Sequence, residues 1–474
     1  MRDFVDLLPV LLPLVGTLML GVGVVHAIMN VRDPRSAVGW VGIIALLPFV
    51  GATLYWIFGI NRVQRRAVAL MRRRELPPPV DLVQGHELDV FTHLIELAAL
   101  TDRVTSRPLL SGNRVDPLID GDAAYPAMLD AIDAATTSVS LITYIFDRDE
   151  VGLAFVDALA RAHARGVAVR VMVDAVGARY SFPTILRTLR KHKVPVARFN
   201  PTIRPWRWTY ANLRNHRKIC VIDGRLGFTG GINFRRNHVL AKSPRHPVRD
   251  LHFRVEGPVV QHMQRTFAED WMFVTRERLE GDVWFPELAA AGDVFARGIT
   301  DGPDFDIDKL KWCIMGGFAC ARRRVRVASP YFLPESELVA AITTARLRGI
   351  EVDIVLSEKN NQALVRWACD AILPELVAAG CRVWKTLGPF DHSKLMVVDD
   401  TWVLLGSCNL DPRSLRLNYE FNIECHDSNL GRDLAHLLES RCQGARLVTL
   451  AELEAYSLLR RLRNRFARLF VPYL

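Results

Sequence analysis

The chain has 474 residues, about three times the ~150-residue size typical of one domain, so a single small module is excluded and two or three folded units are expected. Its 61 Lys and Arg outnumber 51 Asp and Glu, and the net charge of +10 favours an anionic partner such as phospholipid head groups or nucleic acid. Eight cysteines without a C-x-x-C pair indicate neither a disulfide framework nor a zinc site.

Two apolar runs open the chain. Leu7 to Met29 and Ser36 to Ile60 contain no Lys, Arg, Asp or Glu over 23 and 25 residues, enough for a bilayer core of about 30 Å in each case. A cleaved signal peptide would have a shorter apolar core and would leave the second run unexplained. We therefore expect a two-span membrane anchor at residues 1–62, with a re-entrant hairpin as the alternative.

Aromatic residues and then arginines follow the second apolar run. Tyr55, Trp56 and Phe58 are typical of a membrane interface. The basic cluster consists of Arg62, Arg65, Arg66, Arg72, Arg73 and Arg74. Because basic residues concentrate on the cytoplasmic side, this cluster predicts a cytoplasmic location for the rest of the chain, although Arg32 and Arg35 in the first loop weaken the bias.

The remainder divides into a linker and two similar halves. The ELPPP segment at Glu75 to Pro79 cannot continue a helix, so we expect a linker at residues 63–108. Each half then shows a strand, a helix and a strand, which predicts a largely parallel sheet in lobes at 109–290 and 291–446. The predicted elements are Val139–Phe146, Val151–Gly166 and Val167–Gly177 in the first half, and Arg324–Pro334, Glu335–Gly349 and Ile350–Ser357 in the second.

A polar motif, H-x-K-x4-D with a downstream glycine and asparagine, occurs once in each half, and the copies lie 176 residues apart. If the motif lies in a strand, His and Lys share a face and point into one pocket. The Asp stands at a strand-to-turn junction, where a turn-forming role is expected to be the larger part of its function. The residues are His216, Lys218, Asp223, Gly230, Gly231 and Asn233 in the first copy, and His392, Lys394, Asp399, Gly406, Ser407 and Asn409 in the second.

These residue types suit chemistry on a phosphodiester. Lysine and asparagine donors stabilise the negative charge that spreads over the phosphoryl oxygens, without a metal. A neutral imidazole can attack phosphorus, while a second, protonated imidazole gives its proton to the departing alkoxide. The pattern therefore predicts a two-histidine phosphoryl-transfer site.

The motifs resemble those of the phospholipase D superfamily, and more closely those of bacterial cardiolipin synthases. The resemblance extends over the N-terminal runs, NLRNHRKICVIDG and RDLHFRVEGPVV. It implies two α/β lobes around one active site in an inner-membrane protein, with a phosphohistidine intermediate and no metal or cofactor. It further implies that His216 is the nucleophile and His392 the general acid, and that Asp250 and Glu420 orient the histidines. The reaction implied is phosphatidyl transfer between two phosphatidylglycerol molecules.

Three further segments suit an anionic lipid surface, although packed aromatics or ordinary solvated loops are alternatives. Trp206, Trp208 and Tyr210 alternate with arginines just before the first motif. A basic loop after Arg235 contains Arg236, His238, Lys242, Arg245 and His246. Residues 447–474 predict a basic amphipathic helix that either lies on the bilayer or docks on the lobes.

Three functions compete at this point. A phosphatidyltransferase or phospholipase is favoured by the apolar runs together with the paired motifs. A nuclease is disfavoured by the apolar runs, so nucleic acid is not an expected partner despite the charge. A non-catalytic adaptor is disfavoured because both His-Lys pairs are intact. The sequence leaves open transfer against hydrolysis, phosphatidylglycerol against phosphatidylethanolamine as the second substrate, and the oligomeric state.

Overall fold

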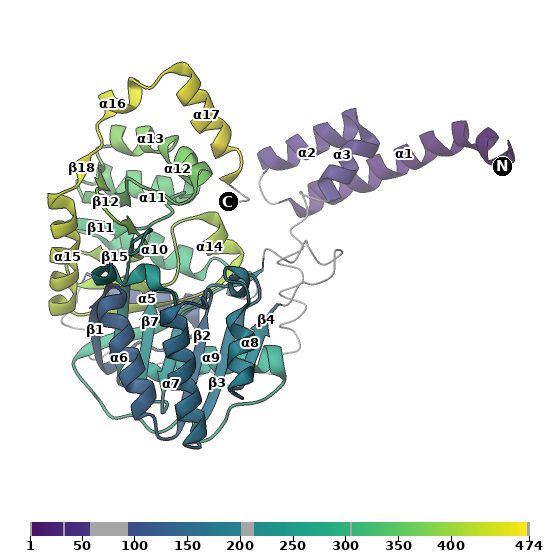
Figure 1. Ribbon diagram of the computed structural model, residues 1–474. Coiled ribbons are helices and arrows are strands. Elements are labelled where there is room, and N and C mark those ends of the chain that lie inside the picture. Colours follow the sequence, from purple (N-terminus) through teal and green to yellow (C-terminus); the bar gives the residue numbers. More distant parts are fainter. Residues whose placement is uncertain (1, 32–33, 57–92, 201–212, 304–305, 472–474) are drawn as a thin grey trace.

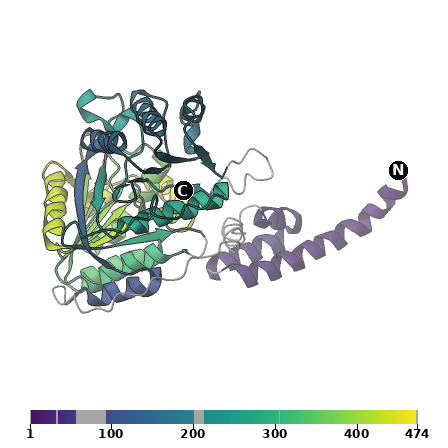
Figure 2. The ribbon, with the colours of Figure 1, turned by 90° about the horizontal axis from the view of Figure 1, so that it is seen from below.

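The structure is a computed structural model that describes residues 2–31, 34–56, 93–200, 213–303 and 306–471 (Figures 1 and 2). Three predicted features lie outside these ranges: the arginine cluster from Arg62 to Arg74, the proline linker at Glu75 to Pro79, and the aromatic segment from Trp206 to Tyr210.

The N-terminal runs form a helical hairpin. Within α1 (Arg2–Asn30), the segment Leu11–Asn30 has a mean hydropathy of 2.1 and is the one helix of the described residues long and apolar enough to cross a membrane. The second run is divided into α2 (Pro34–Leu46) and α3 (Pro48–Leu54), because Pro48 has no amide hydrogen to continue the helix. The predicted second span is therefore not confirmed.

In the described residues, sixteen strands form one sheet that runs through both halves, in the order β18-β13-β12-β11-β15-β16-β17-β10-β1-β9-β7-β6-β2-β3-β4, with β5 paired to β17. The halves meet where β1 and β10 pair antiparallel. The strands of the first half are β1 (Leu110–Ile119), β2 (Ser138–Thr143), β3 (Ala168–Asp174), β4 (Val196–Phe199), β5 (Arg214–Asn215), β6 (Ile219–Ile222), β7 (Leu226–Gly230), β8 (Val248–Arg249) and β9 (Leu251–Glu256). Those of the second are β10 (Val294–Asp301), β11 (Arg324–Ala328), β12 (Glu351–Ser357), β13 (Arg382–Thr386), β14 (Phe390–Asp391), β15 (Leu395–Val398), β16 (Trp402–Gly406), β17 (Asn418–His426) and β18 (Arg446–Leu447).

The two halves repeat one topology, and the predicted strand, helix, strand order is present in each. The order β1-β9-β7-β6-β2-β3-β4 corresponds to β10-β17-β16-β15-β11-β12-β13. The prediction of a largely parallel sheet is wrong, because within the large sheet of the described residues only β2-β3-β4, β11-β12-β13 and the short β5-β17 pair are parallel. The cause is a tight hairpin after each motif, where Asp223 and Gly224, like Asp399 and Asp400, have positive φ angles that suit a turn between antiparallel strands.

Helices cover both faces of the sheet (Figure 1). In the first half α6, α7 and α8 pack on one face and α9 on the other, and in the second half α10, α11, α12 and α13 lie opposite α15. Side chains of α9 and α15 belong to one apolar core with strands of both halves, so the halves are packed as one body. The helices are α5 (Ile95–Thr105), α6 (Asp120–Ala134), α7 (Glu150–Ala164), α8 (Ile185–Lys191), α9 (Val260–Thr275), α10 (Lys309–Cys320), α11 (Ser336–Leu347), α12 (Ala363–Asp370), α13 (Leu373–Ala378), α14 (Pro412–Arg416), α15 (Ser428–Gln443), α16 (Leu450–Glu454) and α17 (Leu458–Arg468).

Candidate active site

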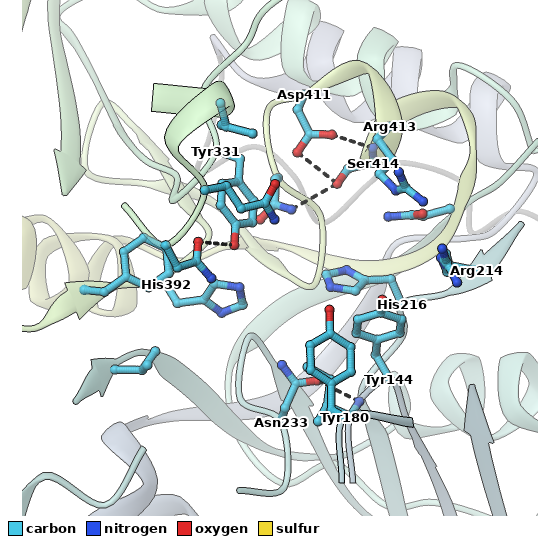
Figure 3. Close-up of a pocket in the computed structure, with 18 of the residues that line it drawn as sticks. Tyr144, Tyr180, Arg214, His216, Asn233, Tyr331, His392, Asp411, Arg413 and Ser414 are labelled. Atoms are coloured by element: carbon cyan, nitrogen blue, oxygen red, sulfur yellow. Dashed lines mark hydrogen bonds between the residues drawn. The ribbon is translucent and has the colours of Figure 1, made fainter. Parts of the chain in front are cut away.

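A cavity of about 390 Å³ lies between the two halves and is lined by both predicted histidines (Figure 3). Tyr144, just after β2, and Tyr331, which follows β11, both line its wall. Ligand sites of open α/β sheets are commonly found beyond the carboxyl ends of their strands, as here. The polar lining residues are Tyr144, Tyr180, Arg214, His216, Asn233, Arg235, His238, Tyr331, Asn361, Gln362, His392, Asn409, Asp411, Arg413, Ser414 and Asn418.

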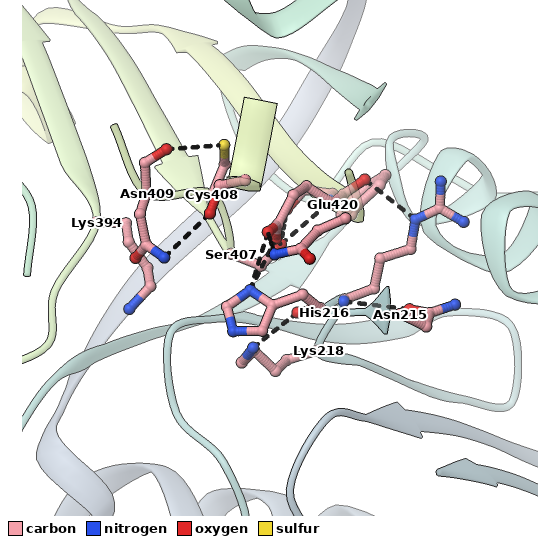
Figure 4. Close-up of polar contacts among 12 residues, drawn as sticks. Asn215, His216, Lys218, Lys394, Ser407, Cys408, Asn409 and Glu420 are labelled. Carbon is pink, nitrogen blue, oxygen red and sulfur yellow. Dashed lines mark hydrogen bonds and ion pairs between the residues drawn. The ribbon is translucent and has the colours of Figure 1, made fainter. Parts of the chain in front are cut away.

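A short parallel strand pair positions the first histidine against the second half. β5 pairs with the start of β17, and the His216 amide donates to the Tyr419 carbonyl at 2.9 Å. This register places His216 Nδ1 3.0 Å from both carboxylate oxygens of Glu420, whose side chain is fully buried (Figure 4). The carboxylate also accepts hydrogen bonds from Ser407 Oγ at 2.5 Å and Asn418 Nδ2 at 3.1 Å.

The second histidine is held by the mirror arrangement. β14 pairs in parallel with β8, and the His392 amide donates to the Arg249 carbonyl at 2.7 Å. His392 Nδ1 then lies 2.7 Å from Asp250 Oδ2, which is also fully buried. Each half thus supplies the carboxylate that orients the histidine of the other half. Because both carboxylates are fully buried, neither Asp250 nor Glu420 is an ordinary surface acid.

The carboxylates determine which imidazole nitrogen faces the cavity. An ionised carboxylate can only accept, so the hydrogen on Nδ1 of His216 points to Glu420 and leaves the Nε2 lone pair free for chemistry. Burial lowers the pKa of His216 to about 4, against the opposing effect of Glu420. Burial and the neighbouring Lys394 lower the pKa of His392 as well. Both imidazoles are therefore neutral near pH 7 before substrate binds.

The two motif lysines lie beneath the histidines. Lys218 Nζ donates to the His216 carbonyl at 2.7 Å, and Lys394 Nζ donates to the His392 carbonyl. Burial lowers the pKa of Lys218 to about 7 and that of Lys394 to about 8. The H-x-K segments precede β6 and β15, so the expectation that they lie inside a strand is wrong. Both histidines line the cavity, whereas neither lysine is among its lining residues.

The motif asparagines and aspartates have different places. Asn233 and Asn409 line the cavity, and Asn409 Oδ1 is buried without a hydrogen-bond partner among the described residues. Asp223 instead accepts from the backbone amides of Thr136, Thr137 and Ser138, which lower its pKa although its burial opposes them.

Asp399 likewise accepts from the amides of Arg322, Arg323 and Arg324. Neither Asp223 nor Asp399 lines the cavity. The turn-forming role that the sequence predicts for both aspartates is the one that this geometry supports. Each ties a hairpin to the start of a neighbouring strand, and the hairpin carries the motif.

The double glycine of the first motif has a steric reason. A Cβ placed on Gly231 would stand 2.1 Å from Asp250 Oδ1, whereas the equivalent Ser407 donates its hydroxyl hydrogen to Glu420. In the first half the carboxylate of Asp250 therefore lies close to the backbone of Gly231. In the second half the longer Glu420 lies further away and is reached by the hydroxyl of Ser407. Gly231 is needed for the position of Asp250 and, through it, of His392.

Several cavity residues were missed from the sequence. Arg413 enters on the short helix α14, which Asp411 caps by accepting from the Ser414 amide at 2.7 Å. The Asp-Pro start of that helix was an available signal. Arg214, at the end of the aromatic, basic segment, also lines the cavity, and its Nε and Nη1 atoms are buried without a partner among the described residues. Tyr144 stacks edge-on against His216 with ring centroids 5.1 Å apart.

Comparison with known proteins identifies this duplicated fold. The family described as "Cardiolipin synthase, PLD-like domain" matches residues 128–271 and again residues 317–442, so both halves are phospholipase D-like domains. The family "Phospholipase D-nuclease N-terminal" matches residues 18–59. Phosphatidylserine synthase of Haemophilus influenzae shares the fold at 14% identity, with a TM-score of 0.62 over 80% of this chain and 100% of that one.

Curated relatives narrow the assignment. Cardiolipin synthase A of Pseudomonas putida is 31% identical over 465 residues, which cover 96% of this chain and 95% of the relative. Cardiolipin synthase 1 of Bacillus cereus is 27% identical over 472 residues, covering 96% and 92%. The chain therefore belongs to the cardiolipin synthase family of the phospholipase D superfamily, as the resemblance implied.

Gly231→Ala tests the steric account. We expect the added methyl to displace Asp250 and with it His392, lowering kcat by roughly 10²-fold, the loss typical of a misplaced reacting group. Gly444→Ala is the matched control, because nothing lies within 4 Å of the added Cβ. Equal activity of the two variants would show that the close approach of Asp250 has no importance.

The pKa values predict the pH profile of kcat/KM. Activity should rise above about pH 4 as His216 becomes neutral, and fall as pH rises through about 7 to 8, because the lowered pKa values of Lys218 and Lys394 remove their charges there. Lys218→Arg keeps a charge at all these pH values and should move the alkaline limb upward. An unchanged limb in this variant would exclude Lys218 as its origin.

Proposed function

We propose that the chain transfers a phosphatidyl group from one phosphatidylglycerol to the glycerol hydroxyl of another, giving cardiolipin and glycerol. The observation that carries this proposal is the cavity between the halves, lined by two buried histidines that are oriented by carboxylates from opposite halves. The names of the curated relatives support the choice of cardiolipin as product.

In the first step the Nε2 lone pair of His216 attacks the phosphorus. The new N–P bond forms as the P–O bond to glycerol breaks, and His392 gives its proton to the glycerol oxygen. His392 is neutral before substrate binds, and the arriving phosphodiester anion favours its protonated form by offsetting the charges of Lys218 and Lys394. Burial opposes ionisation of Glu420, but hydrogen bonds from His216 and Ser407 and the charge of Lys218 lower the pKa of its carboxyl. The ionised Glu420 then stabilises the imidazolium that forms.

In the second step the glycerol hydroxyl of another phosphatidylglycerol attacks the phosphorus. His392, now neutral, takes the hydroxyl proton, and the N–P bond to His216 breaks. Arg214, Arg413, Asn233 and Asn409 line the cavity, where their donors can stabilise the phosphoryl oxygens in both steps. Asp250 and Glu420 act as positioning residues, because they contact the histidines and do not line the cavity.

Hydrolysis to phosphatidic acid is the alternative reaction at the same site, with water in place of the lipid alcohol. A site held at a bilayer meets lipid alcohols at high local concentration and partly excludes water, which favours transfer. Phosphatidylethanolamine as a second substrate fits the same chemistry. Nucleic acid is not proposed as a partner.

His216→Ala should abolish turnover and the covalent intermediate, because no nucleophile remains to hold the phosphatidyl group. The measurement is label retained on protein denatured in detergent near neutral pH, because acid hydrolyses the N–P bond, after incubation with phosphatidylglycerol labelled in its acyl chains. We expect label on the unmodified protein and on His392→Ala, which can form the intermediate slowly, and none on His216→Ala. Label on His216→Ala but not on His392→Ala would reverse the two roles.

Product analysis tests the reaction itself. The purified full-length protein in phosphatidylglycerol vesicles should release free glycerol and cardiolipin in equal amounts, because each transfer expels one glycerol. Asp250→Asn, which removes the carboxylate that orients His392, is the control and should lower the amounts of both products together. Phosphatidic acid as the main lipid product would make the protein a phospholipase and would end the synthase proposal.

We also propose a multi-pass arrangement in the inner membrane, with both lobes in the cytoplasm. The arginines that follow the second apolar run, and the helix at Leu11–Asn30, support this placement. A cysteine replacing the exposed Ser243 should resist a membrane-impermeant thiol reagent in intact cells and react after lysis. Rapid labelling in intact cells would place the lobes outside.

A further inference from the structure

The C-terminal helix α17 presents its large apolar side chains to solvent. Leu459 is 79% exposed, Leu462 55% and Phe466 61%, and the helix lies at the edge of the second half (Figure 1). A helix on a water-soluble body normally turns such residues inward. The apolar face of α17 is Leu458, Leu459, Leu462, Phe466, Leu469 and Phe470, each at least 39% exposed.

The opposite face of α17 is docked on the body. Asn464 and Ala467 are buried, and Ala467 belongs to the apolar core of the second half. The Arg460 guanidinium lies 3.4 Å from the ring centroid of Tyr456, and that of Arg463 lies 4.6 Å from the ring of Trp367 on α12. These contacts fix α17 in the orientation that exposes its leucines. The leucines are therefore exposed although the helix is packed on the body.

Charges flank this apolar face. Arg461, Arg465 and Arg468 are exposed, and the helix from Leu458 to Arg468 contains no acidic residue. An apolar face bordered by arginines suits the boundary between acyl chains and anionic head groups. A second copy of α17 seated on the first would bring arginines against arginines, which disfavours self-association through this face.

We propose that the apolar face of α17 docks the catalytic body on the surface of an anionic bilayer. The leucines and phenylalanines enter the acyl-chain boundary, and the flanking arginines contact lipid phosphates. The helix at Leu11–Asn30 is long and apolar enough to cross a membrane, which favours a bilayer as the partner of this face. This contact is separate from the cavity of the active site, and its test needs no turnover.

The first experiment measures depth in full-length protein reconstituted in phosphatidylglycerol vesicles. Leu459→Cys, in a background where the partly exposed Cys320 and Cys442 are serine, is labelled with a polarity-sensitive fluorophore. The matched control is Leu347→Cys on α11, which is 81% exposed but lies outside the apolar face of α17. We expect nitroxide groups on the lipid acyl chains to quench the label at 459 strongly and the label at 347 weakly.

The second experiment changes the face without disturbing the fold. Leu462→Glu with Phe466→Glu replaces two exposed side chains, so thermal unfolding should stay the same, while quenching of the label at 459 should fall about tenfold. Leu347→Glu is the control and should change nothing. High salt should also reduce quenching, because it screens the arginines.

Three outcomes would overturn the proposal. The first is equal quenching at 459 and 347. The second is the absence of quenching at 459 in phosphatidylglycerol vesicles. The third is a label at 459 that becomes shielded from solvent in detergent as the protein concentration rises. That result would show that a second copy of the chain covers this face.

Discussion

The structure depends on a reciprocal exchange between its two halves. Each histidine of the cavity receives its carboxylate from the opposite half, and a two-residue parallel strand pair sets the register of each exchange. Gene duplication alone would give two lobes with two half-sites. Because of this exchange, each histidine needs the other lobe for its correct orientation. The duplicated halves therefore have to function as one unit. The continuous sheet and the core shared by α9 and α15 hold the lobes at the distance that the exchange requires.

Burial explains why this arrangement suits an anionic substrate. The cations Lys218 and Lys394 have lowered pKa values, and buried atoms of Arg214 lack partners among the described residues. Within that part of the chain the site therefore contains positive charge and donors that are not fully neutralised. A phosphodiester anion supplies the missing acceptors. The same anion favours the protonated form of His392 that the first step needs, so binding prepares the general acid.

The repetition of the fold and the motif pair could be predicted from the sequence, because both depend on local patterns: alternating strands and helices, and two copies of H-x-K. The antiparallel strands could not be predicted from the order of strands and helices alone, because that order does not show that the turns at Asp223 and Asp399 each close an antiparallel hairpin. The apolar length of the second run predicts a second span, but Pro48 divides that run into two shorter helices. The partner of each histidine could not be predicted, because His216 and Glu420 are 204 residues apart and belong to different repeats. Arg413 was missed for a similar reason, since a short capped helix outside the motif carries it.

The most direct test of the exchange is NMR of full-length protein labelled with ¹⁵N-histidine, recorded for Glu420→Gln and Asp250→Asn. The account predicts that Glu420→Gln, in the second half, shifts the Nδ1 and Nε2 signals of His216 and leaves those of His392 in place, and that Asp250→Asn does the reverse. Signal assignment uses His216→Ala and His392→Ala. Shifts confined to the histidine of the mutated half would contradict the exchange and, with it, the description of the cavity as one site built by two lobes.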